Sequence, residues 1–382
     1  MDEPIYLDNS TLARPSSHLL SQMQPYLKRH WHNITAPYLK GKEPFSSIEH
    51  ALRDLDAFVG AHEKDRFFFA ASGAEATAQV YQSAYIDHLS ESGKNHILTT
   101  AVEEAPVLLS VKRYEKLGCV EKVVPLNENG QLTRENLEKI LSPRSGLLSL
   151  SWANSLTGVI HPIWELAELC REKGVLFHVD ASTVLGKLYF KLQDIPIDYL
   201  TFDGTLLHGP KGSGGLFVNR TIAFESLIPE GMPGCHLNTP ALMGLGVAFE
   251  EMSEAFDHLC METTRLRDTL EREVQKAIPE VKVLFQAAER LPHITTLVFP
   301  GVRSELLAFH LRERGVLASF GGGRMQKLEH LLSSCGIDPL DARCALSFSL
   351  SRDTTEEEIR HAIGFIVDAA QKCRTYSPKE LV

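Results

Sequence analysis

The chain has 382 residues, of which 43% are hydrophobic and 23% are charged, and its formal net charge is -10. This length exceeds one ordinary core and suits a large and a small domain. The acidic balance argues against a nucleic-acid or anionic-membrane surface, because phosphate binding needs a basic footprint. No apolar run approaches the ~18 residues that cross a bilayer. The opening MDEPIYLDNS lacks the apolar segment of a signal peptide.

The first half of the chain alternates short apolar runs with amphipathic stretches. Strands are predicted at Arg66–Ala70, His96–Thr99, Gly146–Trp152, Val175–Asp180, Leu200–Asp203 and Gly215–Val218. Helices are predicted between them at Glu75–Leu89, Val107–Leu117, Arg134–Leu141 and Pro162–Lys173. This alternation predicts an α/β fold with a mostly parallel sheet covered on both faces.

Ligands of such sheets bind beyond the carboxyl ends of the strands. In this chain that rule selects a set of loop residues, namely Ser72, Gly73, Asn154, Asp180 and residues 203–208. We therefore expect a ligand site at this rim of the sheet.

The second half predicts a smaller α/β unit. A long helical stretch, Pro240–Ile278, leads into strands at Ile294–Phe299 and Ala345–Leu350 and helices at Glu305–Arg314 and Thr355–Lys372. The last helix opens with Thr-Thr-Glu-Glu-Glu, in which a threonine can cap the helix and the acids favour its first turn. We predict a large domain over residues 15–255 and a small domain made of residues 1–14 and 256–382.

The seven cysteines are scattered, odd in number and form no C-x-x-C pair. This usage predicts neither a disulfide scaffold nor a zinc site, and it favours a reducing cytoplasm.

Several short motifs occur in a characteristic order from Ile5 to Ile359. They are IYLDNS at 5–10, SGA at 72–74, WANS and TGV at 152–159, HVDA at 178–181, GPKG at 209–212, SFSLSR at 347–352 and TTEEEI at 354–359. In this order the chain resembles the cysteine desulfurases of the class-V aminotransferase superfamily. The resemblance implies a large domain with the fold of pyridoxal-phosphate (PLP) dependent transferases. It also implies a homodimer with the active site at the subunit interface.

The resemblance assigns cofactor contacts to a few residues of this chain. Asp180 matches the aspartate that keeps the pyridine nitrogen of PLP protonated, so that the ring can act as an electron sink. Ser72, Gly73, Ala74 and Asn154 match further residues around the cofactor.

The same comparison shows a different residue at the position of the Schiff-base lysine. The family has Ser-x-His-Lys two residues before Gly-Pro-Lys-Gly, whereas this chain has Asp203, Thr205 and Leu206 at the serine, histidine and lysine positions. Leucine cannot form an imine. Lys211 matches a second family lysine and is the possible substitute.

Other positions around the expected cofactor also differ from the family. They are Glu75 in the phosphate cup, Glu104 at the ring-stacking histidine, Ser155 at the ring-hydroxyl asparagine, Thr183 at a glutamine and Ser347 at the substrate-carboxylate arginine. A one-residue slip could bring Asn154 to the place of Ser155. Arg352 keeps the structural arginine of its motif.

Two loops complete the comparison. The loop that brings a Gly-Thr pair and an arginine from the partner subunit is shortened here to residues 231–238. The loop that carries the nucleophilic cysteine corresponds to 318–325, which contains Arg324 but no cysteine. Cys335, which follows it, is predicted to be a packed thiol, and Arg324 to be solvated.

These observations leave three hypotheses. The first is a pseudoenzyme that covalently binds no cofactor and acts as a homodimer, or pairs with a paralogue or with sulfur-relay and iron–sulfur assembly proteins. The second is an active PLP-dependent desulfurase or lyase that uses Lys211 or holds the cofactor non-covalently. In the third, Glu75, Glu104, Asp180 and Asp203, with His178 or His208, hold a divalent cation or an amine. The first is the leading prediction.

Overall fold

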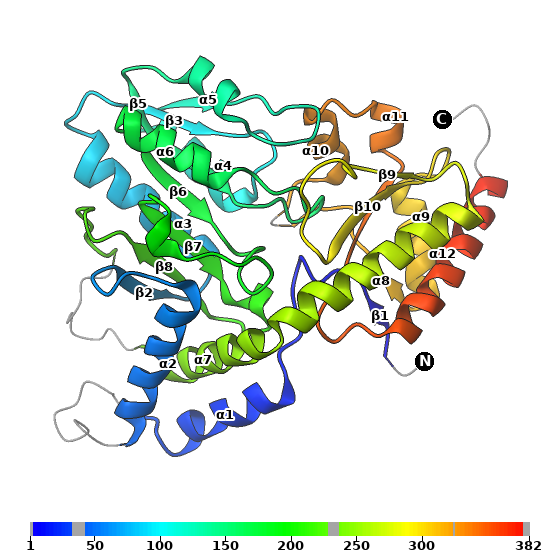
Figure 1. The fold of residues 1–382 in the computed structure, drawn as a ribbon, viewed down its shortest axis with the longest axis horizontal. Coiled ribbons are helices and arrows are strands. Elements are labelled where there is room, and N and C mark those ends of the chain that lie inside the picture. Colours follow the sequence, from blue (N-terminus) through cyan, green and yellow to red (C-terminus); the bar gives the residue numbers. More distant parts are fainter. Residues whose placement is uncertain (1–2, 33–42, 228–236, 324, 377–382) are drawn as a thin grey trace.

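The computed structural model describes residues 3–32, 43–227, 237–323 and 325–376. Its largest feature is a seven-stranded sheet in the order β2-β8-β7-β6-β5-β3-β4 (Figure 1). The strands are β2 Arg66–Ala70, β3 His96–Thr99, β4 Val120–Val123, β5 Ser145–Ser151, β6 Leu176–Asp180, β7 Tyr199–Asp203 and β8 Gly214–Val218. β8 runs opposite to the other strands of this sheet, so it pairs in antiparallel fashion with β2 and β7, and all other pairs are parallel. The predicted mostly parallel α/β sheet is therefore confirmed.

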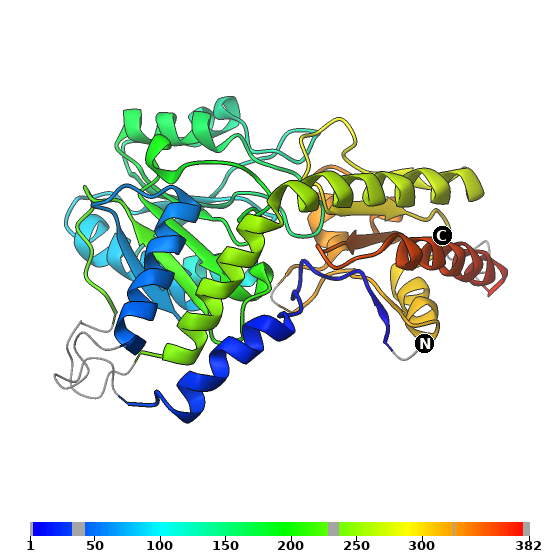
Figure 2. The same ribbon diagram turned by 60° about the horizontal axis from the view of Figure 1, so that its bottom comes forward.

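Helices cover both faces of this sheet (Figure 2). Those of the large unit are α1 Ser17–Lys28, α2 Glu43–Val59, α3 Gly73–Ser83, the π-helical turn η2 Ala84–Leu89, α4 Ala105–Glu115, α5 Arg134–Ile140, α6 Ile163–Lys173 and α7 Thr239–Glu254. Because helices lie on both sides, β5, β7 and β8 are buried along almost their whole length. Burial on both faces is expected for internal strands of a sheet that helices cover on both sides.

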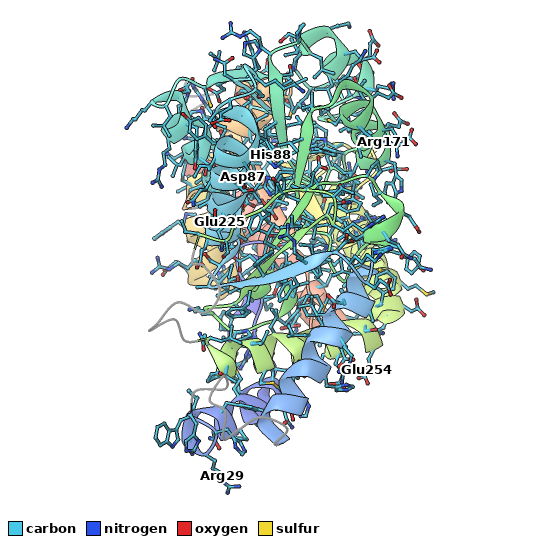
Figure 3. The ribbon with its side chains drawn as sticks, turned by 90° about the vertical axis from the view of Figure 1, so that its left-hand side faces the viewer. Arg29, Asp87, His88, Arg171, Glu225 and Glu254 are labelled. Carbon is cyan, nitrogen blue, oxygen red and sulfur yellow. The ribbon has the colours of Figure 1, made fainter. Side chains whose placement is uncertain are left out.

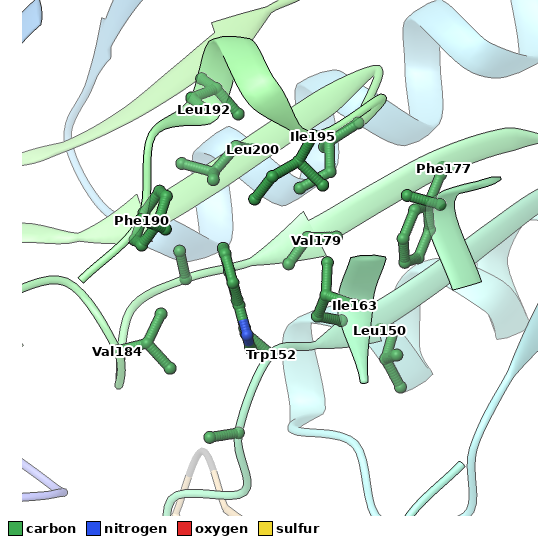
Figure 4. Close-up of a cluster of buried hydrophobic side chains, with 14 of the residues drawn as sticks. Leu150, Trp152, Ile163, Phe177, Val179, Val184, Phe190, Leu192, Ile195 and Leu200 are labelled. Atoms are coloured by element: carbon green, nitrogen blue, oxygen red, sulfur yellow. The ribbon is translucent and has the colours of Figure 1, made fainter. Parts of the chain in front are cut away.

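Trp152, directly after β5, lies at the centre of the largest apolar cluster. Its indole contacts the ring of Phe190, with 4.5 Å between the ring centroids. Val184, Ile163 and Leu150 surround the same indole (Figure 4). Removing a large aromatic side chain from such a site costs about 3–5 kcal/mol, so this cluster fixes the end of β5 and the loop beyond it.

Gly215 in β8 makes room for aromatic side chains of the two strands beside it, β2 and β7. A Cβ atom built on this residue would lie 2.4 Å from the ring of Phe67 and 2.6 Å from the ring of Phe202. Only glycine fits between these rings without displacing them.

The second unit contains two smaller sheets. One is antiparallel, in the order β12-β10-β9, and the other pairs β1 with β11 in parallel. Its strands are β1 Ile5–Tyr6, β9 Lys282–Val283, β10 Ile294–Val298, β11 Val316–Leu317 and β12 Ala345–Ser349; its helices are α8 Phe256–Ala277, α9 Ser304–Glu313, α10 Leu328–Ser334, α11 Pro339–Ala342 and α12 Glu356–Tyr376. Ile5 and Leu7 belong to its core. This supports grouping the first residues with the C-terminal part, although the exact domain limits stay a prediction.

The predicted helix Pro240–Ile278 is two helices, α7 and α8, separated at Ala255. The sequence did not show this break, because helical periodicity continues across it. Most other predicted ends differ from the observed ones by one or two residues, which is the ordinary variation of helix and strand ends. The larger differences are α3, whose predicted span is divided between α3 and η2, and α12, which runs four residues further.

A partly buried ion pair links the two units. Arg352, which follows β12, donates from Nη2 to Glu251 Oε2 of α7, and Ser16 Oγ donates to the other oxygen of the same carboxylate. The structural role predicted for Arg352 agrees with this contact.

The outer end of the large unit carries the polar residues Asp87 and His88 of η2, with Glu225 close to them (Figure 3). Their own contacts are local: Ser83 Oγ donates to Asp87, and His88 Nε2 lies 3.0 Å from the carbonyl oxygen of Ala223. Among the described residues, no helix is both long and apolar enough to cross a membrane.

Candidate functional site

Asp180 ends β6 at the carboxyl edge of the large sheet. Its Oδ1 accepts the N–H of Ser182 at 2.8 Å, and its carbonyl accepts the N–H of Trp152 at 2.9 Å. The residues beside it in the ladder are Ser151 on β5 and Thr201 on β7. The structure therefore holds this carboxylate at the centre of the rim that the strand-end rule selects.

Glu103 is a second acid at this rim, and the sequence analysis missed it. Its side chain is 1% exposed and accepts hydrogen bonds from Thr100 Oγ1, from the N–H of Ser151 and from Ser151 Oγ, at 2.7–2.8 Å. Burial raises the pKa of this carboxyl group to about 7, and the negative charge of Asp180 adds to the shift. The spacing of Thr100 and Glu103 just after β3 was the available signal.

The N-terminus of α3 lies at the same rim. Ser72 caps it, with Oγ accepting the N–H of Glu75 at 3.2 Å, and Ala74 is exposed. The N–H of Gly73 donates to Asp203 Oδ2 at 3.1 Å, and the N–H of Ala71 donates to Glu75 Oε2 at 3.0 Å. Two carboxylates thus accept backbone N–H groups at the start of this helix.

The turn after β7 places Asp203, Thr205 and Leu206. Asp203 Oδ1 accepts from both the N–H and the hydroxyl of Thr205, so the carboxylate also closes its own turn. Leu206 is 2% exposed. Its carbonyl accepts a hydrogen bond from Lys187 Nζ at 3.0 Å.

Lys187 is a buried amine that the sequence analysis also missed. Burial lowers the pKa of Lys187 to about 8, so in a fraction of the molecules this amine is uncharged near neutral pH. No motif pointed to it, since it lies 19 residues before the carbonyl that it contacts.

Two cavities adjoin the 206 turn. A small one is lined by Asn9, Ala13, Lys187, Leu206, His208, Leu259, His293, Leu350 and Ser351. A large open one, of about 1010 Å³, exposes Lys211 together with Arg14, Asp353 and Thr355. Asn9, Ala13 and Ser351 line both cavities. Lys211 therefore lies on a cavity that borders the surroundings of Leu206.

Asn154 supports the loop after Trp152. Its Oδ1 accepts the N–H groups of Leu156 and Thr157 at 3.0 Å, and its Nδ2 donates to the carbonyl of Val102. Because the amide oxygen is engaged in this turn and the amide nitrogen at Val102, the proposed slip from Ser155 to Asn154 gains no support. Ser155 itself is 3% exposed.

Thr183 and Ser347 are also engaged with backbone carbonyls. Thr183 donates to the carbonyl of Ala153 at 2.9 Å, and Ser347, 1% exposed, donates to that of Leu156 at 2.6 Å. These residues hold the loop of Trp152 in place between the two units.

The acidic cluster does not form as a cation site. Glu104 is the N-cap residue of α4, whereas the ring of His178 is buried between Ser149 Oγ and Thr201 Oγ1, each at 2.8 Å. His208 Nδ1 lies 2.7 Å from the carbonyl oxygen of Arg14. Within residues 3–32, 43–227, 237–323 and 325–376, no three His, Cys, Asp or Glu side chains gather as metal ligands would.

Cys335 follows α10 and is 8% exposed, and burial raises the pKa of its thiol to about 12. This agrees with the predicted packed thiol, since a reactive cysteine needs a lowered pKa. Arg324 and most of the shortened loop at 231–238 lie outside the described residues.

The fold and the rim together define the class of the protein. A mostly parallel seven-stranded sheet, an aspartate at the end of β6, a capped helix after β2 and a small unit beside the rim are the elements of a PLP-dependent transferase fold. Residues 5–231 match the family of class-V aminotransferases.

Two relatives cover almost the whole chain. A cysteine desulfurase of Nostoc sp. is 30% identical over 383 residues, covering 98% of this chain and 94% of its own length. A cysteine desulfurase of Sinorhizobium fredii is 32% identical over 385 residues, with 98% of both chains covered. A solved NifS-like protein matches with a TM-score of 0.88 and 25% identity over 97% of this chain and all of its own. The chain belongs to the cysteine desulfurase family of class-V aminotransferases.

These relatives overturn the leading hypothesis of a pseudoenzyme. Proteins that are 30–32% identical over 98% of the chain are named cysteine desulfurases, which points to an active enzyme. The pseudoenzyme hypothesis treated each altered position as a separate loss. It also set aside Lys211, the possible substitute, although this lysine lies on the large cavity and the buried Lys187 contacts the turn of Leu206.

Proposed function

We propose that this chain is an active PLP-dependent enzyme that removes sulfur from cysteine, and that a lysine other than residue 206 supplies its amine. The observation that carries the proposal is the near full-length relationship to proteins named cysteine desulfurase. Members of this family use PLP, which supplies the electron sink for reactions at the Cα atom of an amino acid.

One end of the site suits this cofactor and the other does not. Asp180 stands at the edge of the sheet, where a carboxylate can hold a pyridine nitrogen protonated, and its backbone and side-chain contacts fix its position. At the phosphate end, the carboxylate of Asp203 accepts the N–H of Gly73 at the start of α3, and that of Glu75 accepts the N–H of Ala71 just before the helix. We derive no phosphate contact from these residues.

Among the lysines beside the 206 turn, Lys211 is the best candidate for the amine. Its side chain is exposed on the large cavity, where a small molecule can reach it. Lys187 is buried and already donates to the carbonyl of Leu206, so we assign it the role of positioning that turn. Leu206 itself has no group that can bond to an aldehyde.

Borohydride trapping tests this assignment. Purified protein is incubated with PLP, reduced with borohydride, digested and mapped by mass spectrometry. We expect a stable pyridoxyl adduct on Lys211, which is lost in Lys211→Arg. The matched control is Lys276→Arg, whose side chain is 78% exposed on α8 in the other unit. A reduced protein without any site-directed adduct would contradict the proposal.

The products distinguish a desulfurase reaction from a lyase reaction. A desulfurase passes the sulfur atom of L-cysteine to a thiol and leaves alanine, whereas a lyase releases sulfide and leaves pyruvate and ammonia. The described cysteines are mostly buried, with raised thiol pKa values. We therefore propose that an added thiol, or a protein thiol outside the described residues, accepts the sulfur.

The oligomer and the partners remain predictions. We propose a dimer, as the family resemblance implies, and sulfur-relay or iron–sulfur assembly proteins as partners. Size-exclusion chromatography with light scattering would test the dimer. The cytoplasmic location inferred from cysteine usage also stays a prediction.

A further inference from the structure

The start of α3 already contains an anion that belongs to the protein. A helix N-terminus attracts phosphate, because its first N–H groups have no partner within the helix and the helix dipole favours negative charge. In this chain the N–H of Gly73 donates to Asp203 Oδ2 at 3.1 Å. Asp203 is 8% exposed, so this carboxylate is held inside the protein.

The contact between Asp203 and the helix is close and supported from several sides. A Cβ atom built on Gly73 would lie 3.0 Å from the Cβ of Asp203 and 3.2 Å from its backbone nitrogen. The other carboxylate oxygen accepts two hydrogen bonds from Thr205, and the N–H of Asp203 donates to Ser182 Oγ at 2.9 Å. The carboxylate cannot turn away without breaking this network.

A phosphate dianion at this place would meet two like charges. Glu75, in the first turn of α3, directs its carboxylate to the N–H of Ala71 at 3.0 Å. Like charges that lie close together repel each other, and the repulsion is stronger in a site from which water is partly excluded. The pyridine ring and its aldehyde do not carry this charge, and Asp180 lies on β6, a neighbouring strand.

From this geometry we propose that the carboxylate of Asp203 takes the place of the cofactor phosphate. The site then binds the unphosphorylated aldehyde pyridoxal at least as tightly as PLP. The inference deepens the proposed function and rests on it, because both concern the same site. Asp203 is then a specificity-determining residue of the cofactor site.

Equilibrium dialysis with two probes, PLP and pyridoxal, tests the inference. We expect the wild-type protein to bind pyridoxal at least as tightly as PLP. Asp203→Asn keeps the shape of the side chain, and Asp203→Ser restores the residue that the family has there. Both should tighten PLP binding by about tenfold or more and change pyridoxal binding by less than about threefold. Asp368→Asn, an exposed acid of α12, is the control for loss of one charge.

The outcomes separate the two proposals. A wild-type protein that binds PLP at least tenfold more tightly than pyridoxal overturns the inference, whether or not the variants fold. Unchanged PLP affinity in folded Asp203 variants that still bind pyridoxal also overturns it and leaves the proposed function standing. If neither aldehyde binds to any of these proteins, both proposals are wrong.

Discussion

The strands β6 and β7 lie side by side in one sheet, but the residue at the end of β6 matches the family pattern and those at the end of β7 do not. β6 ends in Asp180, which matches the family and faces the rim. β7 ends in Asp203 and continues to Leu206, where the family has serine and lysine. β7 is buried along its whole length, and β6 is buried over residues 177–179. The difference teaches that packing preserves the strands, whereas the chemistry is determined by a few residues just beyond them.

Among changes at the ends of these two strands, the largest effect is expected from removing Asp180, which β6 shares with the family. Asp180→Ala should lower cysteine turnover about a hundredfold, which is typical for the loss of one preorganised electrostatic contact. Binding of pyridoxal should weaken with it, because the pyridine nitrogen loses its partner. Asp368→Ala serves as the control. Asp198→Ala is unsuitable, because the carboxylate of Asp198 accepts the N–H of Phe177. Unchanged turnover in folded Asp180→Ala would separate this carboxylate from the chemistry.

A second variant makes the β7 end resemble the family. Leu206→Lys introduces an amine at a position that is 2% exposed, at a cost of roughly 2 kcal/mol in unfolding free energy. If the scaffold is otherwise competent, borohydride trapping should move from Lys211 to residue 206. Mass spectrometry of the digested protein locates the adduct, and an adduct that stays on Lys211 would show that the turn no longer faces the cofactor space.

The smallest effect concerns Glu103, whose carboxyl group is influenced by the charge of Asp180. Its pKa in the folded protein is about 7, above the ordinary value of 4.5, so the folded state keeps a proton that the unfolded chain has lost. The unfolding free energy of the wild type should therefore fall, relative to Glu103→Gln, as pH rises from 4.5 to 7. The total change should be on the order of 3 kcal/mol.

Urea unfolding of both proteins at several pH values measures this difference. The buried histidines are present in both proteins, so their own pH dependence cancels. Two parallel curves would mean that Glu103 is not the proton-binding group of the rim.

The sequence predicts the sheet better than the site for a physical reason. A buried strand such as β7 is recognised from its own apolar residues, and its predicted and observed ends differ by one residue. The rim depends on contacts between distant segments. Lys187 approaches Leu206 from another loop, and Asp203 reaches the helix start 130 residues earlier in the chain.

Residue types alone also misplace some polar groups. Glu103 and Glu104 are neighbours in the sequence, but Glu103 is 1% exposed at the rim, while Glu104 precedes α4 as its N-cap residue and is partly exposed. Asn154 looked available for the cofactor, whereas its amide holds the turn of Leu156 and Thr157. Only the folded arrangement distinguishes these roles.

The most direct test of the account is the turnover of L-cysteine by the purified protein, supplied with PLP or pyridoxal and an acceptor thiol, with alanine measured over time. We predict repeated turnover in the wild type and in Lys276→Arg, and its loss in Lys211→Arg. A wild-type protein that forms no alanine and no pyruvate under these conditions would contradict the claim that this family member is an active enzyme.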